Sequence, residues 1–175
     1  MRSAPLTDAT SVRAPAADSQ AARIERARAC LAELYDPEIP SVGILELGML
    51  HDLRVEGGEL VVELLPTFSG CPAIAIITDD VRRVLSQADA GPVRVAVRTD
   101  LPWSTAMISE KGRRQLTEFG IVPPQERRLA AEEIQCLHCG EENVVLVSRF
   151  GPTPCRAIAR CRSCGEPLEV FKPVG

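Results

Sequence analysis

Four of the seven cysteines in this 175-residue chain form two Cys-x-x-Cys-Gly motifs near the C-terminus. The motifs are Cys136 and Cys139 followed by Gly140, and Cys161 and Cys164 followed by Gly165. Two intervening residues let both sulfurs of a motif face one ion, and the glycine permits a tight turn that directs backbone amides toward the thiolates. The sequence therefore predicts a closed tetrahedral site for structural zinc, although rubredoxin-like iron would use the same four thiolates.

Cys71 lies in a different setting, directly before Pro72 and a stretch in which apolar residues recur at helical spacing. A cysteine at the N-cap of a helix faces unpaired amides and the positive end of the helix dipole, and both favour the thiolate. The thiolate is the form that binds iron, accepts sulfur or attacks an electrophile. We therefore expect Cys71 to be a reactive thiol, and the alternative is a cysteine that only caps the helix.

Two further segments carry oxygen ligands or proton acceptors. Asp36 and Glu38 flank a proline, which places two carboxylates on a stiff stretch of backbone, and Thr67 adds a hydroxyl close to Cys71 in the sequence. The alternative role for the two carboxylates is to end a helix and face solvent. Neither stretch contains a histidine or lysine, so a Cys-His nucleophilic enzyme would require the fold to bring His51 to Cys71.

The remaining sulfur and imidazole groups allow more than one interpretation. Cys155 is a fifth thiol in the C-terminal region, where it is either a small core residue or an extra reactive thiol or metal ligand. Cys30 lies on the flank of a helical apolar stripe and is interpreted as a core residue. His138 lies inside the first motif, where four cysteines already complete the ligand set, so we expect it at the surface.

Local patterns predict the elements that must position these groups. A helix with an apolar stripe ends at Asp36, and two strands around a Gly57-Gly58 turn form a hairpin. A second helix follows Pro72, a strand over residues 93–97 pairs in parallel with the hairpin, and Ser109 caps a third helix. The predicted fold class is α+β, with an α-β-β-α-β-α domain built on a mixed sheet and a four-cysteine zinc ribbon after it.

The same patterns divide the chain into four parts. Residues 1–20 are small and polar and are expected to be a disordered tail, and residues 21–122 form the first domain. Residues 123–133 are rich in proline and charge, which is typical of a linker. Residues 134–175 form the ribbon, with short strands expected in "VVLVSRF" and "LEVFK".

Composition limits the classes of function. The net charge of −4 disfavours a nucleic-acid or membrane-surface protein. The arginines of the ribbon have glutamates nearby and no aromatic residues interleaved with them, which disfavours a local nucleic-acid site. The chain contains no uninterrupted apolar run of the ~18 residues that a membrane span needs. Seven cysteines in a chain without a secretory signal indicate thiol or metal chemistry in a reducing compartment, so we expect a cytoplasmic protein.

The motifs together resemble a known family. The stretches "DPEIPSVGILELGML", "PTFSGCP", "VRVAV" and "LPWSTAMISEKGRRQL" resemble the SufT-like iron-sulfur assembly domain, and the tail "FGPTPCRAIARCRSCGEPLEVFK" is similar to the PaaD family. The resemblance covers about residues 21 to 175, and a single proline in "LPW" is its one departure. It places four residues at the functional end of the first domain, namely Asp36, Glu38, Thr67 and Cys71. Cys155 matches a further cysteine of the tail.

PaaD proteins are accessory proteins of bacterial phenylacetyl-CoA epoxidase, so the resemblance implies a role in aerobic phenylacetate degradation. It implies a non-enzymatic maturation factor that helps to insert iron or an iron-sulfur cluster into the reductase or oxygenase components. Cys71, with Asp36 or Glu38, would hold the iron species transiently at a client or homodimer interface, and the ribbon would dock the client. The alternative is a non-catalytic bridging subunit of the epoxidase complex, and a nucleic-acid-binding ribbon is a third hypothesis.

Overall fold

The computed structural model describes residues 19–88, 90–124 and 134–174. Most of the expected tail and linker therefore lies outside the described residues. Ser19 and Gln20, which the sequence assigns to the tail, instead begin the first helix, α1 (Gln20–Leu31). The Ser19 hydroxyl accepts a hydrogen bond from the Ala22 amide over 3.2 Å, so it is the N-cap of α1.

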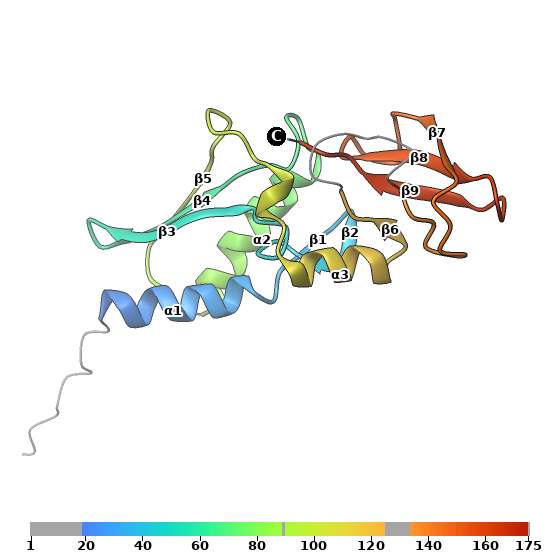
Figure 1. The fold of residues 1–175 in the computed structure, drawn as a ribbon. Coiled ribbons are helices and arrows are strands. Elements are labelled where there is room, and N and C mark those ends of the chain that lie inside the picture. Colours follow the sequence, from blue (N-terminus) through green and yellow to red (C-terminus); the bar gives the residue numbers. More distant parts are fainter. Residues whose placement is uncertain (1–18, 89, 125–133, 175) are drawn as a thin grey trace, which may run out of the picture.

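The predicted hairpin and parallel strand form a three-stranded sheet. Strands β3 (Leu50–Glu56) and β4 (Glu59–Leu64) are antiparallel, and β5 (Val93–Val97) pairs in parallel with β4. The connection from β4 to β5 is α2 (Ala73–Gln87), and both α1 and α2 lie on one side of this sheet (Figure 1). The mixed sheet and the two helices of the prediction are confirmed, although α1 ends at Leu31 and not at Asp36.

The core between the sheet and the helices is mostly aliphatic, as the composition indicates. Leu60, Val62 and Leu64 point from β4 into the core, and the helices contribute residues such as Leu31 and Val81. Full burial of one such side chain stabilises the fold by roughly 1.5–3 kcal/mol. The core therefore holds the strand ends and the loop after β4 in place.

The two short strands after α1 were not predicted. Strand β1 (Tyr35–Asp36) pairs antiparallel with β2 (Ile39–Gly43), so Asp36 and Glu38 lie at the closed end of a tight hairpin. The segment lacks period-two alternation and contains prolines, which is why its sequence resembles a turn rather than a strand. The hairpin fixes the backbone on which both carboxylates stand.

The third predicted helix is confirmed as α3 (Glu110–Glu118), preceded by a short 3₁₀ helix, η1 (Thr105–Met107). The Ser109 hydroxyl accepts a hydrogen bond from the Gly112 amide over 3.0 Å. After α3, strand β6 (Ile121–Val122) pairs in parallel with a strand of the C-terminal sheet. The end of the predicted first domain thus contributes to the sheet of the ribbon.

The C-terminal sheet has four strands in the order β6-β9-β8-β7. Strands β7 (Val144–Ser148) and β9 (Pro167–Phe171) correspond to the two predicted strands. The central strand β8 (Arg156–Cys161) was missed, because arginines and alanines in "RAIARC" give no apolar alternation. We call this sheet with its loops the ribbon, and the part containing α1–α3 and β1–β5 the N-terminal domain.

The ribbon and the N-terminal domain share part of one core. Phe171 and Cys155 of the ribbon pack with the buried residues of the N-terminal domain, whereas a second, smaller cluster lies inside the ribbon. The Phe171 ring lies 6.0 Å from the ring of Trp103, centroid to centroid. The Trp103 indole also donates a hydrogen bond to the Leu47 carbonyl over 2.9 Å. The two parts are therefore held together by buried apolar contacts.

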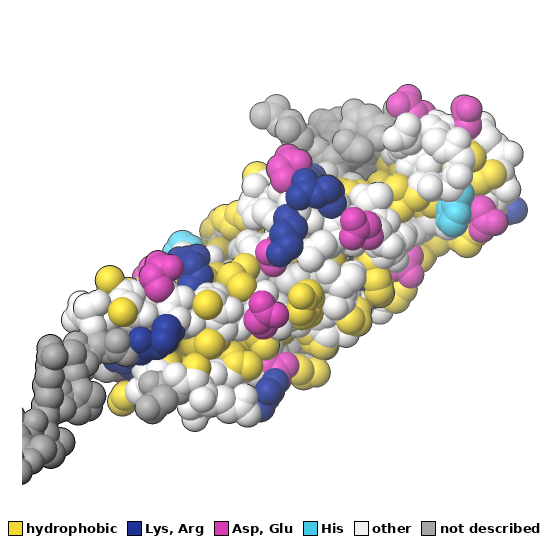
Figure 2. Space-filling model, turned by 90° about the horizontal axis from the view of Figure 1, so that it is seen from below, with side chains coloured by type: hydrophobic (Ala, Val, Ile, Leu, Met, Phe, Trp, Pro, Cys, Tyr) yellow, Lys and Arg dark blue, Asp and Glu magenta, His cyan; other side chains and the backbone are white. Residues whose placement is uncertain are grey.

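Charged side chains of both signs are interspersed with apolar ones on the face shown in Figure 2, and this face has no extended basic patch. That distribution agrees with the acidic net charge and gives no support to a nucleic-acid interface on this face. Within the described ranges, no helix is both long enough and apolar enough to cross a membrane.

Candidate metal centre and thiol site

The four motif cysteines form a compact cluster in the ribbon. Their sulfur atoms all lie within 4.8 Å of one another, with 3.7 Å between Cys136 and Cys164 and 3.6 Å between Cys139 and Cys161. A tetrahedron with zinc-sulfur bonds of roughly 2.3 Å has edges of roughly 3.8 Å. The four sulfurs therefore fit one zinc ion, and a set of four protein ligands leaves no open position for catalysis.

The two motifs have the same backbone geometry. Gly140 and Gly165 have positive φ, and their amides donate to the carbonyls of Cys136 and Cys161 over 2.9 and 3.0 Å. The amides of Cys164 and Ser163 face the Cys161 sulfur and lower its pKa to about 6. At Cys139 the Glu141 amide acts in the same direction, but burial and the neighbouring thiols raise the pKa of that thiol to about 12. The amide donors therefore favour the metal-binding thiolate most clearly at Cys161.

A second group of thiols lies where the ribbon meets the N-terminal domain. A small cavity there is lined by side chains from both parts, including Asp36, Glu38, Thr67, Cys71, Thr153 and Cys155. We call this cavity with its lining the thiol site. The structure thus brings together all four residues that the sequence singles out in the N-terminal domain, and it adds Cys155 from the loop between β7 and β8.

Asp36 is the most deeply buried acid of the thiol site, with only 5% of its surface exposed. Burial raises the pKa of its carboxyl above the usual value, although the amides of Glu38 and Ile39 act in the opposite direction. The Glu38 amide donates to Asp36 Oδ1 over 2.7 Å. The alternative role, in which this carboxylate faces solvent, is therefore excluded for Asp36, and Asp36 is better placed than an exposed acid to take up a proton.

The setting of Cys71 differs from the predicted one in two respects. The N-cap of α2 is Pro72, so Cys71 stands one residue before the cap. Burial raises the pKa of the Cys71 thiol, and the nearby Asp36 and Cys155 raise it further. The amides of Ala73 and Ile74 lower the pKa, but by less. The prediction of a thiolate favoured by the helix end is wrong, because loss of solvent outweighs the helix amides.

Cys155 is held by a chain of polar contacts within the ribbon. The Arg156 guanidinium donates from Nη1 to Glu169 over 2.7 Å and from Nε to the Thr153 hydroxyl over 2.8 Å. That hydroxyl lies 3.1 Å from the Cys155 sulfur. Burial raises the pKa of the Cys155 thiol, the Thr153 hydroxyl opposes the shift, and Asp36 adds to it.

Arg156 also connects the ribbon to the hairpin that carries the acids. Its Nη2 lies 3.5 Å from the Glu38 carbonyl and 4.0 Å from the Glu38 carboxylate. The side chain is buried, with 7% of its surface exposed. Neither Arg156 nor Thr153 was predicted to belong to this site. The one signal for them is the run "GPTPCR", in which two prolines stiffen the loop beside a free thiol.

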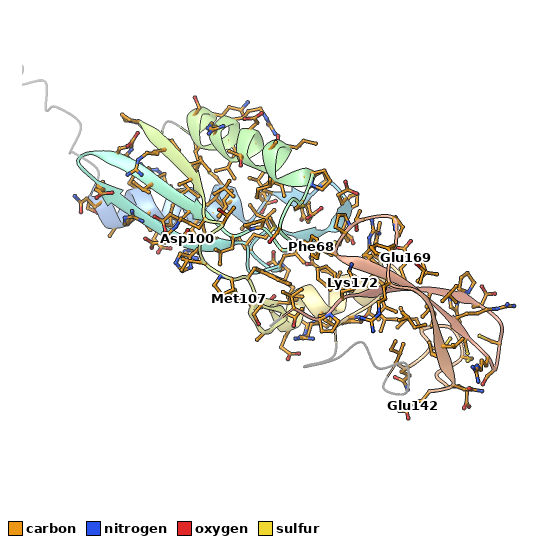
Figure 3. All side chains as sticks on the ribbon, turned by 90° about the horizontal axis from the view of Figure 1, so that it is seen from above. Phe68, Asp100, Met107, Glu142, Glu169 and Lys172 are labelled. Carbon is orange, nitrogen blue, oxygen red and sulfur yellow. The ribbon has the colours of Figure 1, made fainter. Side chains whose placement is uncertain are left out.

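Aromatic rings and a lysine cover the outside of the junction. Lys172 Nζ lies 5.1 Å from the centroid of the Phe68 ring and 6.0 Å from that of the Phe150 ring. Figure 3 shows Phe68 and Lys172 next to each other between the two parts of the chain. The Lys172 amide donates to the Cys155 carbonyl over 2.8 Å. The loop that carries Cys155 is thus fixed from two sides.

Other expected groups lie elsewhere. The lining of the thiol site contains neither histidine nor lysine, so His51 is not placed to act as a base for Cys71. Cys30 packs against the core of the N-terminal domain, and His138 is exposed, both as predicted. The Cys-His enzyme hypothesis therefore has no support in the described part of the chain.

Replacing Asp36 with asparagine is expected to stabilise the fold at neutral pH. A raised pKa means that the folded state prefers the protonated acid. The contribution of Asp36 to the stability of the fold is therefore fully present below the ordinary pKa of 3.8, and it is lost as the pH rises through the pKa of Asp36 in the folded protein. Asparagine keeps the acceptor for the Glu38 amide without the charge. We expect Tm to rise by about 2–4 °C, which corresponds to ~1 kcal/mol in a chain of this size, and the gain to vanish in acid.

Asp100→Asn is the matched control for this thermal unfolding measurement. The Arg98 guanidinium holds the pKa of exposed Asp100 down to about 2, so its carboxylate is favoured in the folded state and the substitution should not raise Tm. A lower Tm for Asp36→Asn than for the wild type at neutral pH would contradict the account of Asp36.

Comparison with known proteins finds similarity in both parts of the chain. Residues 24–102 match the family model of an iron-sulfur cluster assembly protein, and residues 121–172 match that of the PaaD zinc beta ribbon domain. A protein of Escherichia coli (strain K12), named as one subunit of a "Putative 1,2-phenylacetyl-CoA epoxidase", is 36% identical over 147 residues. The match covers 82% of this chain and 89% of that protein.

Comparison with solved structures finds similarity over more than half of this chain. The crystal structure of a domain of unknown function, DUF59, from Bacillus anthracis has a TM-score of 0.52 and 31% identity, and covers 56% of this chain and 94% of that chain. A conserved hypothetical protein from Thermotoga maritima has a TM-score of 0.46 and 21% identity, and covers 53% of this chain and 91% of that chain. The first of these agrees with the fold described above.

Proposed function

This chain belongs to the PaaD family, and from that membership we propose that it is an accessory maturation factor of a phenylacetyl-CoA epoxidase system. In this role it assists the insertion of iron or an iron-sulfur cluster into the reductase, the component with a ferredoxin-type cluster. The match to an iron-sulfur assembly family over residues 24–102 supports maturation rather than oxygenation chemistry.

The observation that carries the proposal is the thiol site. It places Cys71 beside the buried carboxyl of Asp36, and both groups line one cavity at the junction with the ribbon. A thiol and a carboxyl together supply a soft and a hard ligand for iron, and a proton acceptor for the thiol. The four-cysteine cluster has a separate role, because a closed set of four thiolates retains its metal and stabilises the ribbon.

In this mechanism the residues of the chain hold the iron species and move protons. Cys71 loses its proton as the iron arrives, and the Asp36 carboxylate accepts that proton or contributes an oxygen ligand. Burial disfavours the charged form of both groups, so both pKa values are raised when no cation is bound. The iron species must therefore displace protons to bind, and this weakens its binding. That property suits temporary holding and release to a client.

The second candidate function is a bridging subunit that holds the epoxidase components together. One observation favours it: Phe150 and Val147 of the ribbon expose 84% and 62% of their surface. These two side chains are three residues apart in the sequence, and a contiguous group of exposed apolar side chains is typical of contact surfaces. In the maturation role the same residues would dock the client, so this surface does not distinguish the two functions. Replacement of Cys71 distinguishes them, because only the maturation role requires its thiol.

The test is the iron and sulfide content of the reductase after co-expression with each form of the chain. We expect wild-type chain to give filled reductase, and Cys71→Ser to give reductase no better filled than in the absence of the chain. Cys30→Ser is the matched control, because Cys30 is also half-buried but packs against the core away from the thiol site.

Zinc content and Tm of each purified variant verify that the fold is intact. A bridging subunit would tolerate Cys71→Ser and would be damaged only by changes to the ribbon surface. Full occupancy of the reductase with the Cys71→Ser chain would therefore rule out the maturation mechanism.

A further inference from the structure

We propose that Cys71 and Cys155 together bind a single divalent transition-metal ion, with the Asp36 carboxylate as an oxygen ligand. This inference rests on the proposed function and specifies the species that the thiol site handles: one ion such as ferrous iron, not a preformed cluster. In this inference the ribbon also supplies a metal ligand, Cys155, to the thiol site.

The first support is the position of Cys155 in the fold. Cys155 belongs by sequence to the ribbon, yet it packs in the core of the N-terminal domain and not in the small core inside the ribbon. It lines the same cavity as Cys71 and Asp36, and the Asp36 carboxylate acts electrostatically on both thiols. The four zinc ligands do not need a fifth cysteine, so Cys155 is free for this second site.

The size of the cavity favours an ion over a cluster. The cavity has a volume of about 10 Å³, which is roughly the space that one water molecule requires. A single metal ion takes the place of one water molecule, whereas a cluster with several iron and sulfide atoms needs a much larger space. With the ribbon in its place, the thiol site therefore accepts one ion.

The polar contacts around Cys155 prepare its sulfur for a ligand role. Arg156 Nε already donates to the Thr153 hydroxyl over 2.8 Å, so that hydroxyl can direct its own proton at the Cys155 sulfur 3.1 Å away. Hydrogen bonds to a ligand sulfur from outside the coordination sphere orient it and adjust its charge. Glu169 holds the guanidinium from the other side over 2.7 Å.

The loop that carries Cys155 is built to hold this position. The Gly151 amide donates to the Arg156 carbonyl over 3.0 Å, which closes the loop on itself. A Cβ atom at residue 151 would lie 2.9 Å from the carbonyl carbon and oxygen of Arg156, so only glycine permits the approach. Pro152 and Pro154 restrict the backbone between these ends. The thiol is therefore placed by a stiff loop.

The ligand set is incomplete, and this separates the thiol site from the ribbon cluster. Among the described residues, only the four ribbon cysteines bring three or more ligand atoms within 4.8 Å of one another. The ligands of the thiol site must therefore move together when an ion binds, which weakens binding. Two thiols and one carboxylate also leave a coordination position that a client ligand can occupy, so the ion can be passed on.

Binding is balanced in charge and protons. Each thiol loses one proton, so one divalent ion replaces two protons and forms two metal-sulfur bonds, with no change in oxidation state. Both protons leave to solvent, because the Asp36 carboxylate binds the ion as an anion. Binding should therefore weaken as the pH falls, as it does for other thiolate sites.

The experiment is an anaerobic titration of the full chain with Co²⁺, after the ribbon has been filled with one equivalent of zinc. Zinc binds such ligand sets more tightly than cobalt, so the ribbon keeps its zinc. We expect wild type and the control Cys30→Ser to bind one cobalt ion with a thiolate-to-cobalt charge-transfer band. Cys71→Ser and Cys155→Ser should each weaken the band and lower the affinity at least about tenfold, since even outer-shell changes cost roughly 10–100-fold.

Cys155→Ala serves as a second variant, and zinc content and Tm show whether each variant is folded. An unchanged band and affinity in folded Cys155→Ser and Cys155→Ala would overturn the two-thiol site. If those variants also fill the reductase, the inference fails while the proposed function stands. If Cys71→Ser fills the reductase, the proposed function fails whatever the titration shows.

Discussion

Removal of the metal from the four-cysteine cluster is expected to unfold the ribbon and to expose Trp103 in the N-terminal domain. A structural zinc site of this kind contributes on the order of 10 kcal/mol, and the separate core of the ribbon is too small to replace that amount. Trp103 is the single tryptophan of the chain, is 3% exposed and lies against Phe171 of the ribbon. Its fluorescence should therefore shift to longer wavelength when the ribbon leaves.

The measurement is tryptophan emission and circular dichroism during treatment with a chelator, followed by addition of zinc. We expect loss of the ribbon strands together with the emission shift, and recovery of both when zinc is restored. If the metal-free protein kept its strands and its emission maximum, the zinc would not be structural. An emission shift without loss of strands would show that the ribbon undocks as a folded unit and would contradict unfolding.

Replacement of Phe171 with alanine is expected to destabilise the whole chain by about 3–5 kcal/mol, the usual loss for a fully buried aromatic residue. Phe171 is 1% exposed and packs in the core of the N-terminal domain, although it lies on strand β9 of the ribbon. The cavity left behind would open between the two parts of the chain, next to Cys155. The change should therefore lower both the stability and the metal affinity of the thiol site.

Urea unfolding compares Phe171→Ala with Phe150→Ala, which removes the same side chain from a position that is 84% exposed. The exposed substitution should change the free energy of unfolding by no more than about 0.5 kcal/mol. Equal effects of the two substitutions would contradict a shared core between the ribbon and the N-terminal domain.

Much of the fold follows from local patterns that the sequence displays openly. The Gly57-Gly58 turn, the helix after Pro72 and the Ser109 cap each depend on neighbouring residues, and each is confirmed. The four ribbon cysteines are equally local, because two residues and a glycine define each half of the cluster. Elements without such signals, namely strands β6 and β8 and the β1-β2 hairpin, were missed.

The thiol site depends on distant contacts, and these could not be read from the sequence. Nothing in the sequence near Cys155 indicates that the ribbon packs against the loop before α2, and this contact removes water from Cys71. The helix end was visible in the sequence, but the desolvation that outweighs it was not, so the predicted direction of the Cys71 pKa was wrong. Arg156 was hidden for the same reason, since its partners Glu38 and Glu169 lie far from each other in the sequence.

The most direct test of the maturation role measures cluster formation in purified apo-reductase supplied with ferrous iron and sulfide under anaerobic conditions, with and without this chain. The rate at which the absorbance of the cluster appears is recorded for wild type, Cys71→Ser and the control Cys30→Ser. The maturation role predicts that wild type and Cys30→Ser accelerate cluster formation. With Cys71→Ser, the rate should equal that of the reductase without any added chain. The same rate with and without the wild-type chain, or equal acceleration by Cys71→Ser, would contradict it.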